Sequence, residues 1–143
     1  MKKKVIVVVW FLLFSASIVN SHDFLLANNH KDSEFSFKYY GDGSEYGLKP
    51  RRKEDDTAAY MKNNASSTSV SVSVAGTNDK NYRGSVKANW CSDDYTIKPG
   101  KYKYMSNTVY NNYKYAYLLI GKDDKKKHTI SGKWSPDNIC GKY

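Results

Sequence analysis

A predicted β-hairpin near the carboxyl terminus constrains the fold of this chain more than any other segment. The run Tyr113–Tyr117 carries tyrosine at every second position, a period that is typical of a strand with one buried face. A polar break at residues 121–127 separates it from a second β-like run at residues 129–134. This spacing predicts two antiparallel strands joined by a charged tip, with the tyrosines on the buried face.

Two earlier segments repeat the same period. Aromatic residues alternate with polar ones in Glu34–Tyr40, and valine alternates with serine in Thr68–Ala75. Tyrosine, serine, threonine and valine favour pleated, half-buried surfaces over helices, and the chain contains 13 tyrosines. We therefore expect an all-β fold, a small antiparallel β-sandwich or a partly open barrel of about seven short strands.

The amino terminus has the layout of a secretory signal peptide. Lysines at positions 2–4 precede the unbroken apolar run Val5–Phe14, and small and polar residues follow at positions 15–21. The alternative is a membrane anchor, but a spanning helix needs about 20 consecutive apolar residues. We predict a signal-peptide helix within residues 1–27 and no transmembrane segment after cleavage.

Cleavage is expected after Ser21 or after Ala27, which leaves a single secreted β-domain at residues 28–143. The formal net charge of the chain is +9, and the domain stays strongly basic without the leader. A basic exported protein favours anionic surroundings such as wall polymers, lipid head groups or acidic glycans, although the charge can also serve solubility alone. Nucleic acid is not expected as a partner, because no basic helical stripe or ribonucleoprotein motif is present.

The two cysteines, Cys91 and Cys140, are predicted to form one disulfide bond, as is usual for an even count in an exported chain. Such a bond would close a loop of about 50 residues and would contribute on the order of 4 kcal/mol. The competing interpretation is a metal site, but two thiols at this spacing, without a CxxC motif or a nearby histidine pair, do not favour it. We expect no metal and no other cofactor.

Candidate binding residues lie in and after the hairpin. Lysines cluster at its tip and are candidates for electrostatic binding: Lys122, Lys125, Lys126 and Lys127. Trp134 is either a core residue or a candidate for aromatic contact with a ligand. A charge block at residues 51–56, three basic residues followed by three acidic ones, is expected to neutralise itself on a solvated surface.

Catalysis is not expected. A nucleophile needs a base beside it, and the only histidines after the leader are His30, near the start of the domain, and His128, next to a lysine run. Pairs of carboxylates are sequence neighbours, so on a strand they would point to opposite faces. We therefore predict that the protein is not an enzyme and has no catalytic residue.

Three parts of the sequence together resemble an uncharacterised family of small exported proteins of low-GC Gram-positive bacteria, grouped as a domain of unknown function. They are the ending Ser131–Asp137, which contains Trp-Ser-Pro-Asp, the early run Glu34–Phe37, and a middle set made of Arg52, Lys53, Asp56, Thr57 and Tyr60. The resemblance implies an extracellular bacterial β-domain and supplies no catalytic residue. Only the Trp-Ser-Pro-Asp ending is specific.

The sequence thus favours a secreted, non-catalytic interaction protein that acts at or outside the bacterial cell envelope. Its expected partner is an anionic cell-wall polymer or a glycan, and its expected location is extracellular, in association with the wall. The alternative is a secreted bacteriocin-like antagonist, which small size, export and positive charge also fit. Against the antagonist, no amphipathic helix that could enter a membrane is predicted.

Overall fold

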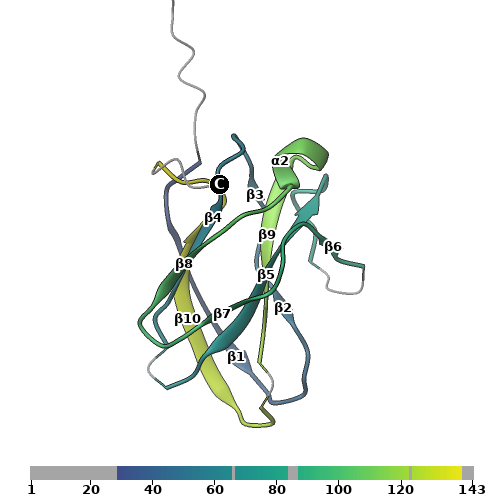
Figure 1. The fold of residues 1–143 in the computed structure, drawn as a ribbon. Helices are drawn as coiled ribbons and strands as arrows, with labels where there is room; N and C mark the ends of the chain where they lie inside the picture. The colour runs from purple at the N-terminus through teal and green to yellow at the C-terminus, as the bar shows by residue number, and fades with distance from the viewer. Residues whose placement is uncertain (1–28, 66, 84–86, 123, 140–143) are drawn as a thin grey trace, which may run out of the picture.

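The computed structural model describes residues 29–65, 67–83, 87–122 and 124–139 as two antiparallel β-sheets packed face to face, with one short helix. The predicted all-β sandwich is confirmed (Figure 1). The described ranges contain ten strands where about seven were expected, because several strands have only two or three residues. The predicted signal peptide, residues 1–27, lies outside these ranges.

The first sheet has four strands in the order β1-β10-β4-β8. Their bounds are Ser33–Tyr39 for β1, His128–Ser135 for β10, Ala59–Asn63 for β4 and Tyr102–Met105 for β8. The strand β10 lies between β1 and β4 and pairs with both of them. The first and last strands of the domain are therefore neighbours in space.

The second sheet is centred on the long antiparallel pair β5 (Val70–Thr77) and β9 (Tyr115–Gly121). Short strands complete it on both sides. They are β2 (Tyr46–Gly47) and β3 (Arg51–Arg52) beside β9, and β6 (Asn89–Trp90) and β7 (Tyr95–Ile97) beside β5. The predicted hairpin is wrong as a paired unit. β9 and β10 are the two expected strands, but they belong to opposite sheets and pair with other strands, not with each other.

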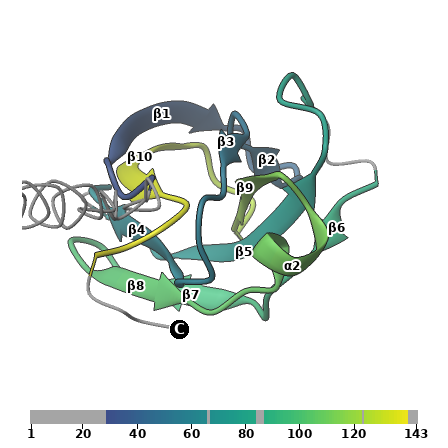
Figure 2. The ribbon, with the colours of Figure 1, turned by 90° about the horizontal axis from the view of Figure 1, so that it is seen from above.

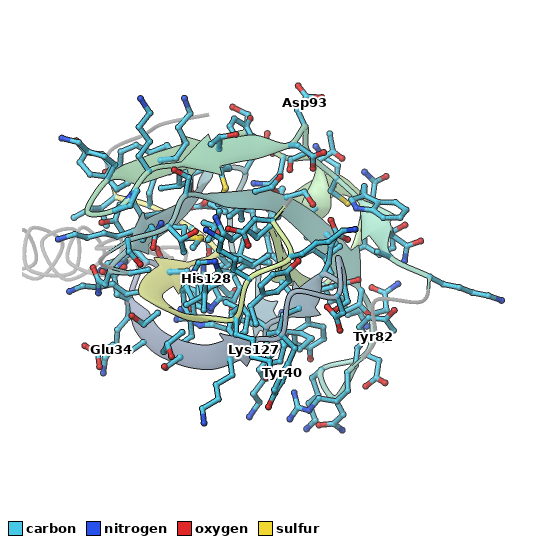
Figure 3. The ribbon with its side chains drawn as sticks, turned by 90° about the horizontal axis from the view of Figure 1, so that it is seen from below. Glu34, Tyr40, Tyr82, Asp93, Lys127 and His128 are labelled. Carbon is cyan, nitrogen blue, oxygen red and sulfur yellow. The ribbon has the colours of Figure 1, made fainter. Side chains whose placement is uncertain are left out.

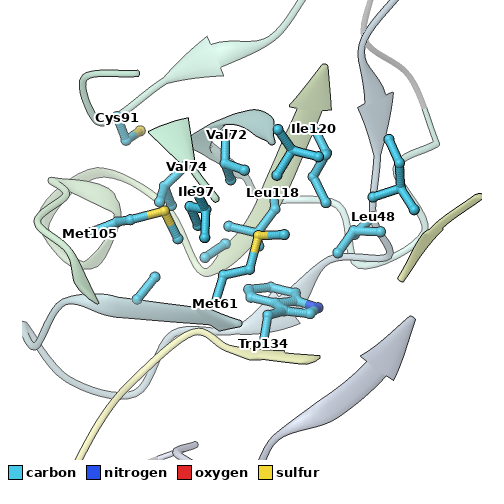
Figure 4. Packing of buried hydrophobic residues seen from close by; sticks show 14 of the residues in the cluster. Leu48, Met61, Val72, Val74, Cys91, Ile97, Met105, Leu118, Ile120 and Trp134 are labelled. Carbon is cyan, nitrogen blue, oxygen red and sulfur yellow. The ribbon is translucent and has the colours of Figure 1, made fainter. Parts of the chain in front are cut away.

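The core fills the space between the sheets (Figures 2 and 4). On β5, alternate valines face it, as the pattern predicted, and on β1 Phe37 and Tyr39 do the same. The facing sheet contributes Met61, Ile130 and Trp134 from β4 and β10. The two-residue alternation thus identified the buried face correctly on these strands.

The prediction for β9 was wrong about the face. The residues that enter the main core are Ala116, Leu118 and Ile120, which alternate with the tyrosines. Tyr117 and Leu119 point to the other side of the sheet, where a second, smaller cluster covers them. Because both faces are buried, alternation alone could not say which one faces the sandwich interior.

The predicted disulfide is not supported. Cys91 is a free, buried thiol at the edge of the core, and Cys140 lies outside the described residues. Burial raises the pKa of the Cys91 thiol, and hydrogen bonding with Thr108 and Gly76 offsets only part of that rise. A raised pKa keeps the thiol protonated and unreactive at neutral pH.

The only helix of the described ranges is α2 (Val109–Asn112), a single turn between β8 and β9. Within those same ranges, no helix is both long enough and apolar enough to cross a membrane.

Candidate functional site

The connection between β9 and β10, which contains residues 122–127 and which we call the tip, is fixed to the rest of the domain through Tyr39, at the end of β1. The buried hydroxyl of Tyr39 donates a hydrogen bond to the carbonyl oxygen of Lys122 at 2.7 Å and accepts one from the N–H of Gly43 at 3.1 Å. Gly41 lies directly against the tip, since a Cβ at this position would be 2.4 Å from the carbonyl oxygen of Lys125. The tip therefore has a defined position on the body.

Asp124 organises the tip from within. Its carboxylate lies 3.0 Å from the ammonium group of Lys122 and 3.0 Å from Nε2 of His128, and it accepts the backbone N–H of Lys126 at 3.1 Å. Desolvation alone would raise the pKa of Asp124. The hydrogen bonds from Lys122, Lys126 and His128 outweigh it, so the pKa lies below the usual 3.8.

This arrangement separates the four predicted binding lysines into two kinds. Lys122 is largely buried, with a side chain that is 14% exposed, and it is committed to Asp124. Lys125, Lys126 and Lys127 are exposed side by side, and we call these three the tip lysines. The structure therefore does not support Lys122 as a free binding cation.

The tip lysines have an aromatic neighbour. Tyr40 is 64% exposed and, together with Lys38 of β1, lines a shallow groove of about 160 Å³ that also includes Lys127 and His128. Figure 3 shows the labelled Tyr40, Lys127 and His128 on the same side of the molecule. Lysine ammonium groups beside an exposed ring can hold a polymer that carries both negative charge and apolar surface.

Acidification is expected to loosen the tip only where Asp124 becomes protonated. A carboxyl group whose pKa is lowered by folding contributes stability that is present above its unfolded pKa and is lost as the pH falls through its folded pKa. The amide signal of Lys126 in NMR should therefore shift as the pH falls below about 4 and Asp124 becomes protonated. Asp124→Asn should abolish this titration, and Asp93→Asn, at an exposed carboxyl group outside the tip, should leave it intact. An unchanged titration in Asp124→Asn would contradict the assignment.

Trp134, the candidate for aromatic contact, is buried. Only 2% of it is exposed, and it belongs to the main core. The guanidinium carbon of Arg51 lies 5.4 Å from the centre of its ring, and Arg51 Nη1 donates to the backbone oxygen of Trp134 at 2.8 Å. A ligand therefore has no access to this ring in the folded domain, and the interpretation as a core residue is the correct one.

The charge block at residues 51–56 does not simply neutralise itself on the surface, as was predicted. The side chain of Lys53 is completely buried and pairs with the equally buried Asp137 at 2.9 Å. Its ammonium group also donates to the carbonyl oxygen of Pro136 at 2.7 Å and to that of Thr57. All three donors of Lys53 are thus satisfied. Arg52 and Glu54 form the expected kind of surface pair, at 3.0 Å.

Asp137 uses its second carboxylate oxygen to hold the backbone. Oδ2 accepts the N–H of Glu54 and the N–H of Asn29, both at 3.0 Å. The next residue continues the connection, since Asn138 Nδ2 donates to the carbonyl oxygen of Ala58 at 2.7 Å. We call this group around Lys53 and Asp137 the buried ion-pair cluster. It joins two of the sequence segments that carry the family resemblance.

A groove that the sequence did not reveal lies at the end of the first sheet, near the end of β10. Three tyrosines line it, Tyr60 on β4 and Tyr102 and Tyr104 on β8. The tyrosine alternation in β8 is visible in the sequence. The pairing of β8 with β4, which brings the three rings together, is not.

The described residues offer little for catalysis. Among them, no group of three or more histidine, cysteine, aspartate or glutamate side chains is placed to hold a metal ion. The side-chain hydrogen bonds of His128 in the same ranges go to the carboxylate of Asp124 and to no hydroxyl or thiol. A nucleophile that a base could activate is therefore not found beside this histidine.

Comparison with known proteins gives a family but no activity. No curated protein and no solved structure matches the chain. A family described as "Protein of unknown function (DUF2712)" matches residues 24–138. This range includes the tip, the buried ion-pair cluster and the three tyrosines of the groove. Since this match covers most of the sequence, the chain belongs to the DUF2712 family of proteins of unknown function.

Proposed function

We propose that this protein is a secreted, non-catalytic interaction module that adsorbs to an anionic polymer at the bacterial cell envelope. The signal-peptide pattern and the net charge of +9 motivate export and an anionic partner. The contact surface is formed by the tip lysines, with Lys38 and Tyr40 beside them.

The observation that carries this proposal is the fixed presentation of the tip lysines. Exposed lysines on a mobile loop lose side-chain and backbone entropy when they bind. Here the backbone of the tip is already held by the hydroxyl of Tyr39 and the carboxylate of Asp124. The three ammonium groups of Lys125, Lys126 and Lys127 can therefore engage a polymer with the main chain already in place.

Replacing Lys125, Lys126 and Lys127 together with serine is expected to weaken adsorption strongly. At anionic lipid surfaces each lysine contributes about 1 kcal/mol, so three should change the affinity for a polyanion on the order of 100-fold at low salt. The measurement is adsorption of the purified protein to immobilised poly(glycerol phosphate). Raising the salt concentration should weaken the adsorption of the unmodified protein in the same way, because salt screens exposed charges.

The matched control changes three exposed lysines elsewhere, Lys80, Lys98 and Lys114, to serine. This variant loses the same charge and should keep most of the adsorption. Equal losses in the two variants would show that net charge alone drives adsorption. Adsorption that high salt leaves unchanged would contradict the electrostatic mechanism.

The same protein should be applied to growing Gram-positive bacteria. Adsorption to the cells without loss of growth fits an interaction module. Growth inhibition or leakage of an entrapped dye would instead identify a secreted antagonist.

A further inference from the structure

The groove lined by Tyr60, Tyr102 and Tyr104, which we call the tyrosine groove, is a separate surface from the tip. It has a volume of about 540 Å³, within the range of ligand-sized sites. The strand β10 separates the two surfaces, because His128 adjoins the tip and Ser135, seven residues later, lines the groove. At about 3.3 Å per residue the separation is roughly 23 Å, and Figure 1 shows the two ends of β10 at opposite ends of the first sheet.

The three tyrosines lie on the outer face of the sheet. Met61 and Met105, which neighbour Tyr60 and Tyr104 in sequence, are core residues, so the alternate tyrosines point outward. Tyr60 is paired with Tyr104 in the strand register. Tyr102 is 60% exposed, so most of its ring faces solvent and contributes little to the packing of the fold.

The rings form one continuous surface. Their centres are 5.4 Å apart for Tyr60 and Tyr104, 5.8 Å for Tyr60 and Tyr102, and 5.9 Å for Tyr102 and Tyr104. Rings at these distances are in contact with one another. No quaternary ammonium group fits between them, which argues against an aromatic cage for a cation. Their planes meet at 40–79°, so they also lack the parallel ridges between which proline rings would insert.

Polar groups border the aromatic surface. Asp32, before β1, and Ser135, at the end of β10, line the groove. The pKa of Tyr60 is raised by desolvation and by the neighbouring Asp32 and Tyr102, which places negative potential at the rings. Lys62 and Lys133 lie on the same outer face, with Lys62 opposite Tyr102 in the register, but neither lysine lines the groove. The lining combines the carboxyl group of Asp32 and the ring of His30 with three phenol rings. This mainly aromatic, weakly charged surface suits an uncharged ligand.

We propose that this groove binds an uncharged, β-1,4-linked chain of pyranose sugars. Such a chain is flat, with C–H groups on the faces of its rings and hydroxyl groups at their edges. The face of one sugar ring can stack on the exposed Tyr102, and its edges can contact the tilted rings of Tyr60 and Tyr104. The hydroxyl groups can hydrogen-bond to Asp32 and Ser135. The site does not depend on the tip lysines, and it gives the protein a second, salt-insensitive contact with a glycan.

The test is isothermal titration calorimetry of the purified protein with two uncharged probes, cellohexaose and the hexamer of N-acetylglucosamine. We expect binding to at least one of them, with an affinity that is the same at low and high salt. Tyr102→Ala should weaken it by about tenfold or more, because a stacking surface is lost. Since Tyr102 is largely exposed, this variant should remain folded, as unfolding in urea will verify.

Trp90→Ala is the matched control, because Trp90 is as exposed as Tyr102, at 60%, but lies on β6 in the other sheet. It should bind the probes as the original protein does, and so should the triple serine variant of the tip lysines. Failure of both uncharged probes to bind, or equal binding by Tyr102→Ala, would overturn the proposal. Binding only of poly(glycerol phosphate) or of a proline-rich decapeptide at this groove would overturn it as well.

Discussion

Replacing Lys53 with methionine is expected to lower the free energy of unfolding by about 3–5 kcal/mol, the usual cost of removing one partner of a buried ion pair. The carboxylate of Asp137 would remain in the interior without the ammonium group that pairs with it. The carbonyl oxygens of Thr57 and Pro136 would lose their donor as well. Unfolding in urea, followed by tryptophan fluorescence, measures the change.

The neighbouring residue provides the control. Arg52 pairs with Glu54 at 3.0 Å, but the side chain of Arg52 is 62% exposed. Solvent screens such a pair, so Arg52→Met should change the stability by at most about 1 kcal/mol. Losses of similar size in Lys53→Met and Arg52→Met would show that Lys53 does not form the buried ion pair with Asp137.

A double variant separates the ion pair from the hydrogen bonds around it. Asp137→Asn removes the negative charge and keeps one side-chain oxygen as an acceptor for the backbone N–H groups of Asn29 and Glu54. Adding it to Lys53→Met should therefore recover part of the lost stability, a non-additive result that indicates direct coupling. If the two losses simply added, the residues would act independently.

The buried ion-pair cluster also shows where prediction from the sequence reaches its limit. Alternation is a local property, so the valine face of β5 and the aromatic face of β1 could be identified from neighbouring residues. The partner of Lys53 is 84 positions away. Lys53 follows β3 of the second sheet and Asp137 follows β10 of the first, so only the packing of the two sheets brings them together, and nothing near residue 53 signals it.

The segment from β9 to β10 shows the same limit at shorter range. Its two strands, the charged connection between them and the exposure of Lys125–Lys127 follow from local pattern, but the predicted pairing of the two strands is wrong, because they belong to different sheets. The burial of Lys122 does not follow from local pattern, because its ammonium group also donates to the carbonyl oxygen of Ser69, which directly precedes β5, at 3.4 Å. The tyrosine groove likewise requires the pairing of two strands that are about 40 residues apart in sequence.

Trp134→Ala is the second substitution with a large expected effect, a loss of about 3–5 kcal/mol in the free energy of unfolding. The indole ring lies in the main core beside Met61, its register partner on β4 (Figure 4). Truncation to alanine would remove the largest apolar side chain of this sheet and leave a cavity. It would also remove the ring on which the guanidinium group of Arg51 lies.

Trp90 is the control of the same residue type. It lies on the short strand β6 and is 60% exposed, so Trp90→Ala should change the stability by no more than about 0.5 kcal/mol. Thermal unfolding monitored by circular dichroism compares the two variants without relying on either tryptophan as a probe. A small loss in Trp134→Ala would mean that the ring is not part of the core.

The difference in stability between Trp134→Ala and Trp90→Ala affects how binding data on this family should be interpreted. A tryptophan within the distinctive Trp-Ser-Pro-Asp ending invites mutation as a ligand contact, but a loss of binding in Trp134→Ala would reflect the lower stability of the domain and not a lost contact. Loss of binding can be assigned to a contact only in variants that keep their stability. Tyr102→Ala and the triple serine variant of the tip lysines should meet that condition, because the side chains they remove are exposed. These variants, and not Trp134→Ala, are the ones that can locate a binding site on this domain.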